Sequence, residues 1–289
     1  MIDNVSKFIA RFTGFASRMI STFKSPHSEV DDVRYLQVLN EIKTTGLEDA
    51  INEITHLRQQ QVDKSWLNDW SCQNLPEGTM VTDKMAHKIA HHARHSTSPT
   101  LNAVILRKIA IRINARAILE LGTSTGISSA YLVLERNTKL DTIERDPEIV
   151  YAAQCLHQQL NIDSVNYHTG DFDIVLKQLL KTRLHYDLVF IDGDHRYERT
   201  IHYFNTLLPY CADNAIIILD DIYWSFGMIK AWKILRDHPR VQWSIDTYHT
   251  GIIRLRPSGI TSRPVHRYCM PDQWMNWLFR RRKKKGEID

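Results

Sequence analysis

The sequence of 289 residues predicts an α/β protein with a doubly wound, mostly parallel sheet. Between residues 116 and 256, short apolar runs alternate with segments of helical periodicity, which is the pattern of βαβ units. The runs are AILELG, LDTIE, VNYH, YDLVFID and AIIILD. Two more strand-like runs, VQWSIDTY and GIIRLR, follow with little between them. We therefore expect a Rossmann-like sheet that ends in one antiparallel edge.

The segments between these strands carry apolar residues at the three- and four-residue spacing of amphipathic helices. The helices predicted in and just before the sheet are 101–113, 127–135, 148–160, 172–180, 197–208 and 226–237. Two further periodic stretches, 5–23 and 33–57, precede them. The first of these two can pack on the core or on a partner subunit, or it can lie in a membrane interface.

The chain divides into three predicted parts. An N-terminal helical extension spans residues 1–85, a central domain spans residues 86–256, and a C-terminal tail spans residues 257–289. The last ten residues hold six cations and two anions, which accounts for the whole formal net charge of +4. Because the remaining body is neutral, it lacks the clustered cations of a nucleic-acid-binding surface, and no nucleic-acid partner is expected.

The tail bears on location. Trp274, Trp277 and Phe279 directly precede the run RRRKKK, and aromatic anchors beside cations suit weak contact with an anionic membrane surface. A solvated tail is the alternative. No apolar run reaches the roughly 18 residues of a membrane span. We expect a cytoplasmic protein, either free or peripheral to the inner membrane.

Cysteine spacing gives no sign of a metal or disulfide scaffold. The four cysteines lie far apart without a C-x-x-C pair, so neither a disulfide framework nor a zinc knuckle is expected. Four histidines (His87, His91, His92 and His95) share helical spacing in another segment. An exposed or substrate-covering face is favoured there over a zinc site.

In an open α/β sheet, ligands bind at the carboxyl ends of the strands. The first strand is followed by ELGTSTG, residues 120–126, where Gly122 and Gly126 permit a tight turn and close backbone approach to a ligand. This is not G-x-G-x-x-G, which argues against an NAD-dependent enzyme. Glu144 ends the second strand roughly 20 residues later, where a ribose diol would be held. A purely structural turn and a solvated Glu144 are the alternatives.

Acidic residues follow the later strands. Gly170 and Asp171 follow the third, where Asp171 suits a helix cap better than an adenine contact. The fourth and fifth strands are followed by DGDH, residues 192–195, and by the pair Asp220 and Asp221. Crowded carboxylates repel one another unless they are hydrogen-bonded, protonated or bridged by a cation. Mg²⁺ accepts such oxygen ligands, so a functional site is expected here.

These motifs resemble those of class I S-adenosylmethionine-dependent methyltransferases, in particular the small-molecule O-methyltransferase branch that includes catechol O-methyltransferase. The resemblance covers about residues 86–256 and rests on ILELGTSTGISSAYL, DGDHRY and DDIYWS. The last two motifs are also similar to a set of bacterial methyltransferase-like proteins that carry DGxHxY and DDIxWS. The resemblance implies a seven-stranded sheet of order 3-2-1-4-5-7-6 with strand seven antiparallel. It also implies S-adenosylmethionine as the cofactor.

The resemblance assigns roles residue by residue. The implied cofactor-binding residues are Glu120, Gly122, Ser124, Gly126, Glu144, Gly170, Asp171 and Asp192. The implied ligands of Mg²⁺ or another divalent cation are Asp192, Asp220 and Asp221, where the branch has Asp, Asp and Asn. His195 holds the position of the branch's catalytic lysine, so His195 and Asp192 are the expected catalytic residues. A hydrogen-bonding loop residue is the alternative for His195.

The sequence thus predicts an enzyme that methylates an oxygen atom of a small molecule, with a homodimer as one assembly open to it. The competing hypothesis is a non-catalytic scaffold protein that keeps the methyltransferase fold at a membrane. Several aromatic residues can wall an apolar substrate pocket or belong to the core. They are Tyr223, Trp224, Phe226, Trp232 and Trp243, with Tyr223 and Trp224 favoured for the pocket.

Overall fold

The computed structural model describes residues 47–70, 81–95, 100–134, 137–182, 185–247, 249–260 and 264–267. The chain divides into two units, residues 1–48 and 49–289, and the fold described below belongs to the second. The predicted helix 5–23 and the aromatic and basic residues of the tail lie outside the described residues, so their predicted roles remain predictions.

The core of the fold is an eight-stranded sheet of order β3-β2-β1-β4-β5-β7-β6-β8. The strands are β1 (Ala117–Leu121), β2 (Lys139–Glu144), β3 (Val165–Thr169), β4 (Tyr186–Ile191), β5 (Cys211–Leu219), β6 (Val241–Asp246), β7 (Gly251–Leu255) and β8 (Val265–Arg267). Strands β1 to β5 pair in parallel, whereas β7 runs antiparallel to both β5 and β6. The predicted seven-strand order and its antiparallel seventh strand are confirmed.

Strand β8 is an addition to that prediction. It pairs in parallel with β6 at the edge of the sheet and lies beyond residue 256. A strand of three residues is too short to show a period of two, so the sequence pattern gives no signal for it.

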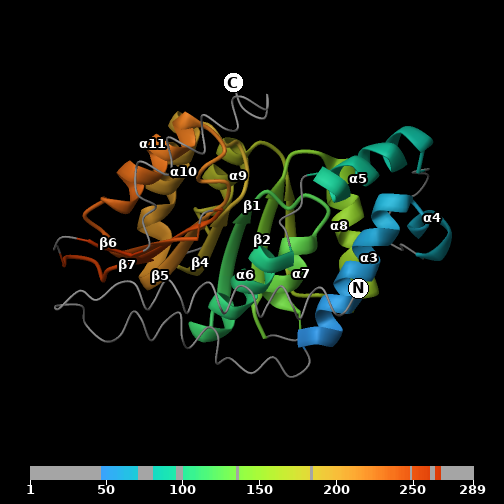
Figure 1. The fold of residues 1–289 in the computed structure, drawn as a ribbon, viewed down its shortest axis with the longest axis horizontal. Helices are drawn as coiled ribbons and strands as arrows, with labels where there is room; N and C mark the ends of the chain where they lie inside the picture. The colour runs from blue at the N-terminus through green and yellow to red at the C-terminus, as the bar shows by residue number, and fades with distance from the viewer. Residues whose placement is uncertain are drawn as a thin grey trace. The chain divides into compact units, whose positions relative to one another are not determined.

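The helices surround this sheet (Figure 1). They are α3 (Leu47–Asp63), α4 (Trp66–Asp69), α5 (Asp83–His95), α6 (Thr100–Arg112), α7 (Ile127–Val133), α8 (Pro147–Gln159), α9 (Phe172–Leu179), α10 (Tyr197–Leu207) and α11 (Phe226–Arg236), with a 3₁₀ turn at Leu208–Tyr210. The six helices predicted between residues 101 and 237 all form, with ends that differ by a residue or two. Within the described ranges, no helix combines the length and apolar character that a membrane crossing requires.

Side chains alternate between the two faces of the sheet, and this alternation separates two packed layers. Leu119 and Leu121 of β1 join a core with apolar residues of α9, α10 and α11, including the fully buried Phe204. The intervening Glu120 points to the opposite face, where its carboxylate meets hydroxyls of α7. Figure 1 shows α9, α10 and α11 gathered on one side of the sheet and α7 and α8 on the other.

Side chains cap the N-termini of several helices and thereby fix the residue at which each strand-to-helix turn ends. Asp146 caps α8 by accepting from the Glu148 backbone N–H at 3.0 Å, and Pro147 occupies the first turn. Ser225 caps α11 in the same manner through the Met228 N–H. Each cap stabilises its helix by about 1 kcal/mol and places the preceding residue at the sheet edge.

The cysteines differ in state. Cys211 is buried and free, whereas Cys155 on α8 is disulfide-bonded. The sequence does not predict this bond, because separation along the chain carries no information about proximity in the fold.

Candidate functional site

The turn after β1 is packed against the end of β4. Gly122 has φ +104°, and a Cβ atom on it would lie 1.9 Å from the backbone oxygen of Asp192. Gly126 has φ +87°, and a Cβ atom there would lie 2.9 Å from that of Ala153 on α8. Only glycine fits both the positive φ and these contacts. The glycine-rich turn therefore brings its backbone to the carboxyl edge of the sheet.

Glu144 lies beside this turn and is anchored by backbone donors. Its Oε2 accepts from the Ser124 N–H at 3.2 Å, and its Oε1 accepts from Arg145 and Asp146 N–H groups at 2.8 and 3.1 Å. The Ser124 and Thr125 hydroxyls are buried and have no hydrogen-bond partner among the described residues. Buried hydroxyls without partners are uncommon, so these two are available to a ligand.

Glu120 is held inside the protein. Its side chain is fully buried and accepts from Ser128 Oγ at 2.6 Å, Thr142 Oγ1 at 2.7 Å and the hydroxyl of Ser129. Burial raises the pKa of Glu120 to about 7, while the three hydroxyl donors act in the opposite direction. These contacts make Glu120 a support for the turn between β1 and α7 in this structure.

His157 on α8 supports the same turn and was not predicted. Its Nε2 lies 2.7 Å from the backbone oxygen of Gly126, and its Nδ1 contacts the Tyr167 hydroxyl. A carbonyl oxygen only accepts, so Nε2 carries the hydrogen and Nδ1 accepts from Tyr167. Burial lowers the pKa of His157 to about 4, which keeps the ring neutral.

Gln61 ties helix α3 to the same turn. This fully buried residue of α3 donates from Nε2 to the backbone oxygens of Thr125 and Ala152, each at 3.3 Å. A glutamine within a helical pattern gives no sequence signal for such a role. Helix α3 therefore contributes directly to the support of the glycine-rich turn.

Gly170 and Asp171 follow β3 at the same sheet edge. Gly170 has φ +149°, and Asp171 caps α9 by accepting from the Asp173 N–H at 2.9 Å. The helix cap anticipated for Asp171 is thus present. The adenine contact of these residues stays a prediction.

Two histidines and three aspartates gather where β4 and β5 end. His195 Nε2 lies 3.7 Å from Asp192 Oδ1 and 3.8 Å from Asp221 Oδ2. His249 Nδ1 lies 3.1 Å from Asp220 Oδ1, and its Nε2 lies 3.4 Å from Asp221 Oδ1. His249 was missed because it precedes a strand rather than following one.

The crowding of these carboxylates has an electrostatic consequence. Burial raises the pKa of Asp192 well above its ordinary value, and the charges of Asp220 and Asp221 raise it further. The cluster therefore favours bound protons or cations between its aspartates.

One set of ligand atoms in this cluster is close enough for a metal ion. Carboxylate oxygens of Asp220 and Asp221 and a ring nitrogen of His249 all lie within 4.8 Å of one another. No other group of three or more such residues occurs in the described part of the chain, which includes the four histidines of α5. The set differs from the predicted trio because His249 stands in it and Asp192 does not.

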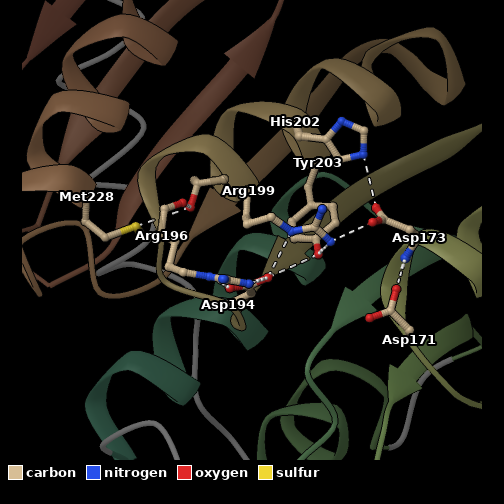
Figure 2. Close-up of polar contacts among 9 residues, drawn as sticks. Asp171, Asp173, Asp194, Arg196, Arg199, His202, Tyr203 and Met228 are labelled. Carbon is tan, nitrogen blue, oxygen red and sulfur yellow. Dashed lines mark hydrogen bonds and ion pairs between the residues drawn. The ribbon is translucent and has the colours of Figure 1, made fainter.

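Asp194, although adjacent to this cluster in sequence, belongs to a separate ion-pair network (Figure 2). Its carboxylate accepts from Arg196 Nη2 at 2.8 Å and Arg199 Nε at 3.0 Å, and Arg199 Nη2 also reaches Asp173 Oδ2 at 2.7 Å. The Arg196 hydrogen bonds hold the pKa of Asp194 below its ordinary value. Arg199 thus ties the loop after β4 to α9 and so steadies the backbone that carries Asp192 and His195.

The aromatic residues divide between core and surface. Tyr223 is buried and donates to Asp246, and Trp232 Nε1 donates to the same carboxylate at 3.1 Å. Trp243 is also buried, whereas Trp224 and Phe226 are 52% and 58% exposed. The Trp224 ring centroid lies 6.4 Å from that of His195. Of the two residues favoured for a substrate pocket, only Trp224 lies open beside the histidine.

One family of known proteins matches part of the chain. Residues 119–222 match a family model described as a methyltransferase domain. No curated protein matches the chain.

Solved structures share the fold. An O-methyltransferase from Bacillus cereus, solved with S-adenosylhomocysteine, is 21% identical with a TM-score of 0.51, and the match covers 66% of this chain and 100% of that one. An O-methyltransferase of tomaymycin synthesis from Streptomyces achromogenes, solved with S-adenosylmethionine, is 18% identical with a TM-score of 0.50 over 62% and 92% of the two chains. A methyltransferase from Podospora anserina is 16% identical, also at 0.50, over 62% and 91%. Residues 119–222 therefore match a methyltransferase domain, and the chain shares the fold of these solved methyltransferases.

Proposed function

We propose that this domain transfers the methyl group of S-adenosylmethionine to an oxygen atom of a small molecule. The observation that carries the proposal is the position of Glu144 and the glycine-rich turn at the same sheet edge as the Asp–His cluster. One part of that edge suits a ribose and an amino-acid moiety, and the other suits removal of a proton. The two neighbours solved with the cofactor or its product support this arrangement.

The residues around the turn fit the cofactor. The bare backbone at Gly122 leaves no side chain in the way of a ligand. Three backbone N–H groups donate to Glu144, which leaves one of its four acceptor positions for a ribose hydroxyl. The unpartnered hydroxyls of Ser124 and Thr125 offer further polar contacts. When bound, S-adenosylmethionine supplies an electrophilic methyl group on a sulfonium, and the transfer depends mainly on alignment.

His195 is the proposed general base. Its Nε2 faces Asp192 and Asp221, so a proton taken from an acceptor hydroxyl would form an imidazolium next to two carboxylates. Histidine is the side chain that most often serves as a general base in enzymes. The acceptor oxygen would gain the methyl group as the bond from that group to the sulfonium sulfur breaks, which would leave S-adenosylhomocysteine. The acceptor's proton would remain on His195 until solvent removes it.

A divalent cation fits the same cluster. Asp220 and Asp221 present carboxylate oxygens close together, and such oxygens are ligands for hard divalent ions. A bound ion would lower the pKa of an acceptor hydroxyl as a Lewis acid.

The Glu144→Ala variant tests the cofactor site. We expect its affinity for S-adenosylmethionine and S-adenosylhomocysteine to fall roughly 10- to 100-fold, because a charge-assisted hydrogen bond contributes about 1.5–3 kcal/mol. Isothermal titration calorimetry measures this. The matched control is Glu148→Ala, since Glu148 lies four residues further along the chain, in the first turn of α8, and pairs with the partly exposed Lys88. Equal affinities for all three proteins would remove Glu144 from the site, and absence of binding to the unmodified chain would favour the scaffold hypothesis.

The His195→Ala variant tests the chemistry. We expect turnover to fall roughly 10²- to 10⁴-fold, the usual contribution of a general base, while cofactor affinity changes little. The measurement is S-adenosylhomocysteine formation with catechol and simple phenols as probe acceptors. His202→Ala is the control, because His202 forms an exposed pair with Asp173 outside the cluster. Turnover that equals that of the control would exclude His195 as the base.

A further inference from the structure

We propose that His249 is a protein ligand of a divalent transition-metal ion, together with Asp220 and Asp221. The inference rests on the proposed function, since the ion would serve the same reaction. It differs from the sequence-based expectation of an all-carboxylate set with Asp192. It also changes the expected metal from Mg²⁺ to an ion that accepts nitrogen.

The topology explains why His249 reaches the cluster. Strand β7 lies antiparallel to β5, and its first residue, Gly251, pairs with Leu219 at the end of β5. Residues just before β7 must therefore lie beside residues just after β5. The backbone fixes this neighbourhood further, because the Ile222 N–H donates to the His249 oxygen at 3.1 Å.

The turn that carries His249 is itself closed by hydrogen bonds. The Thr247 N–H donates to the Thr250 oxygen at 3.0 Å, and the Thr250 N–H donates back to Thr247 Oγ1 at 3.2 Å. Thr250 Oγ1 lies 3.2 Å from Asp220 Oδ1 and orients that carboxylate. Such outer contacts hold metal ligands in position and contribute to affinity. The imidazole is thus presented by a constrained hairpin turn.

The separations of the donor atoms suit a common ion. His249 Nδ1 lies 3.1 Å from Asp220 Oδ1, and Nε2, on the other side of the ring, lies 3.4 Å from Asp221 Oδ1. An ion would take one of these two nitrogens, and one ring nitrogen and one oxygen from each aspartate lie within 4.8 Å of one another. Metal–ligand bonds of about 2.0–2.2 Å require separations of this order between ligand atoms. Asp220 is only 5% exposed, and a buried carboxylate needs a positive partner.

The donor set also predicts which ion binds. Carboxylate and water ligands suit both Mg²⁺ and Mn²⁺, whereas an imidazole suits Zn²⁺, Fe²⁺ or Ni²⁺. Mn²⁺, as a transition-metal ion, accepts a nitrogen ligand more readily than Mg²⁺ does. Two carboxylates balance the charge of one divalent ion. Asp192 and His195, which contact each other at 3.7 Å, then stay available to cofactor and acceptor.

The alternative to a metal ion in this cluster is a proton on His249. A protonated His249 would itself be the counter-ion of both aspartates, and a metal ion would have to displace that proton. The two arrangements predict opposite effects of removing the imidazole. Loss of a ligand weakens metal binding, whereas loss of a competing cation strengthens it.

The experiment measures metal affinity on the full chain after chelator treatment, by Mn²⁺ electron paramagnetic resonance and calorimetry, with Mg²⁺ as competitor. We expect one Mn²⁺ site that Mg²⁺ occupies at least tenfold more weakly. His249→Ala should weaken Mn²⁺ binding roughly 10- to 100-fold and reduce the Mn²⁺-over-Mg²⁺ preference. Asp192→Asn should have a smaller effect on Mn²⁺ affinity, and the control His202→Ala should have none.

Several outcomes would overturn the inference. The first is the absence of a Mn²⁺ site, and the second is unchanged or tighter Mn²⁺ binding by His249→Ala. The third is a loss of Mn²⁺ affinity in Asp192→Asn that exceeds the loss in His249→Ala. Thermal melts of each variant exclude unfolding as the cause of weaker metal binding. If His249→Ala does not fold, His249→Asp takes its place, because aspartate keeps a ligand atom at this position. We expect the metal preference of His249→Asp to shift toward Mg²⁺. S-adenosylmethionine binding in the presence of chelator is measured separately. Loss of that binding contradicts the proposed function, whereas the metal results contradict only the role of His249.

Discussion

The Gly122→Ala variant is expected to lose measurable S-adenosylmethionine binding and about 3 kcal/mol or more of unfolding free energy. A Cβ atom at this position would lie 1.9 Å from the backbone oxygen of Asp192, and backbone cannot rotate away as a side chain can. Positive φ adds about 1–2 kcal/mol for a residue with a Cβ atom, and overpacking adds about 1–3 kcal/mol. Relief of the clash requires β1 and β4 to separate at their carboxyl ends, which displaces both the glycine-rich turn and the loop with Asp192.

The matched control is Gly259→Ala. Gly259 also has a positive φ, +84°, but a Cβ atom there would meet nothing within 4 Å. Its substitution should therefore show the conformational cost alone, about 1 kcal/mol, with unchanged cofactor affinity. Urea unfolding and calorimetry compare the two variants. If both lose the same stability and both bind the cofactor, the close approach of the turn to Asp192 does not constrain the site.

The fold could be predicted in detail because its sequence signals are local. Each parallel strand is a short apolar run, and each is followed by a helical period, so βαβ units can be recognised without tertiary information. The same rule locates the candidate site, since parallel strands deliver Gly122, Glu144 and Asp192 to one edge. The order of the strands is not contained in these local signals; the resemblance to class I methyltransferases implied it, and the observed sheet agrees with it.

The remaining features of the candidate site depend on contacts between segments that are distant in the sequence. His249 reaches the cluster through the start of an antiparallel strand, so a search restricted to the ends of strands passes over it. His157 lies in the last turn of α8, where a basic residue is ordinary and has no distinctive meaning. Asp194 looks equivalent to Asp192 in the motif DGDH, yet its positive φ of 52° and two arginines give it a structural role. Contacts between segments determine the role of each of these residues, and a local sequence pattern does not contain those contacts.

The His157→Gln variant is expected to change how stability depends on pH. Burial lowers the pKa of His157 from 6.5 to about 4, so between these values the unfolded chain binds a proton that the folded protein does not. The stability from this residue is therefore fully present above about pH 6.5 and is lost as the pH falls to about 4. The full loss is about 3 kcal/mol, at 1.36 kcal/mol for each unit of pKa. Glutamine can still donate to the Gly126 oxygen but does not titrate.

The contribution of Glu120 to stability changes with pH in the opposite direction, so the two contributions must be measured separately. Its pKa is raised from 4.5 to about 7, so the stability it contributes is present below about pH 4.5 and is lost as the pH rises through 7. In the unmodified protein the two slopes oppose each other between about pH 4.5 and 6.5. Urea unfolding at pH 4.5–7.5 should show the stability of His157→Gln falling with rising pH relative to the unmodified protein, and that of Glu120→Gln rising. Parallel curves for all three proteins would mean that neither group is held in its neutral form, and the turn would then lack the internal support assigned to it.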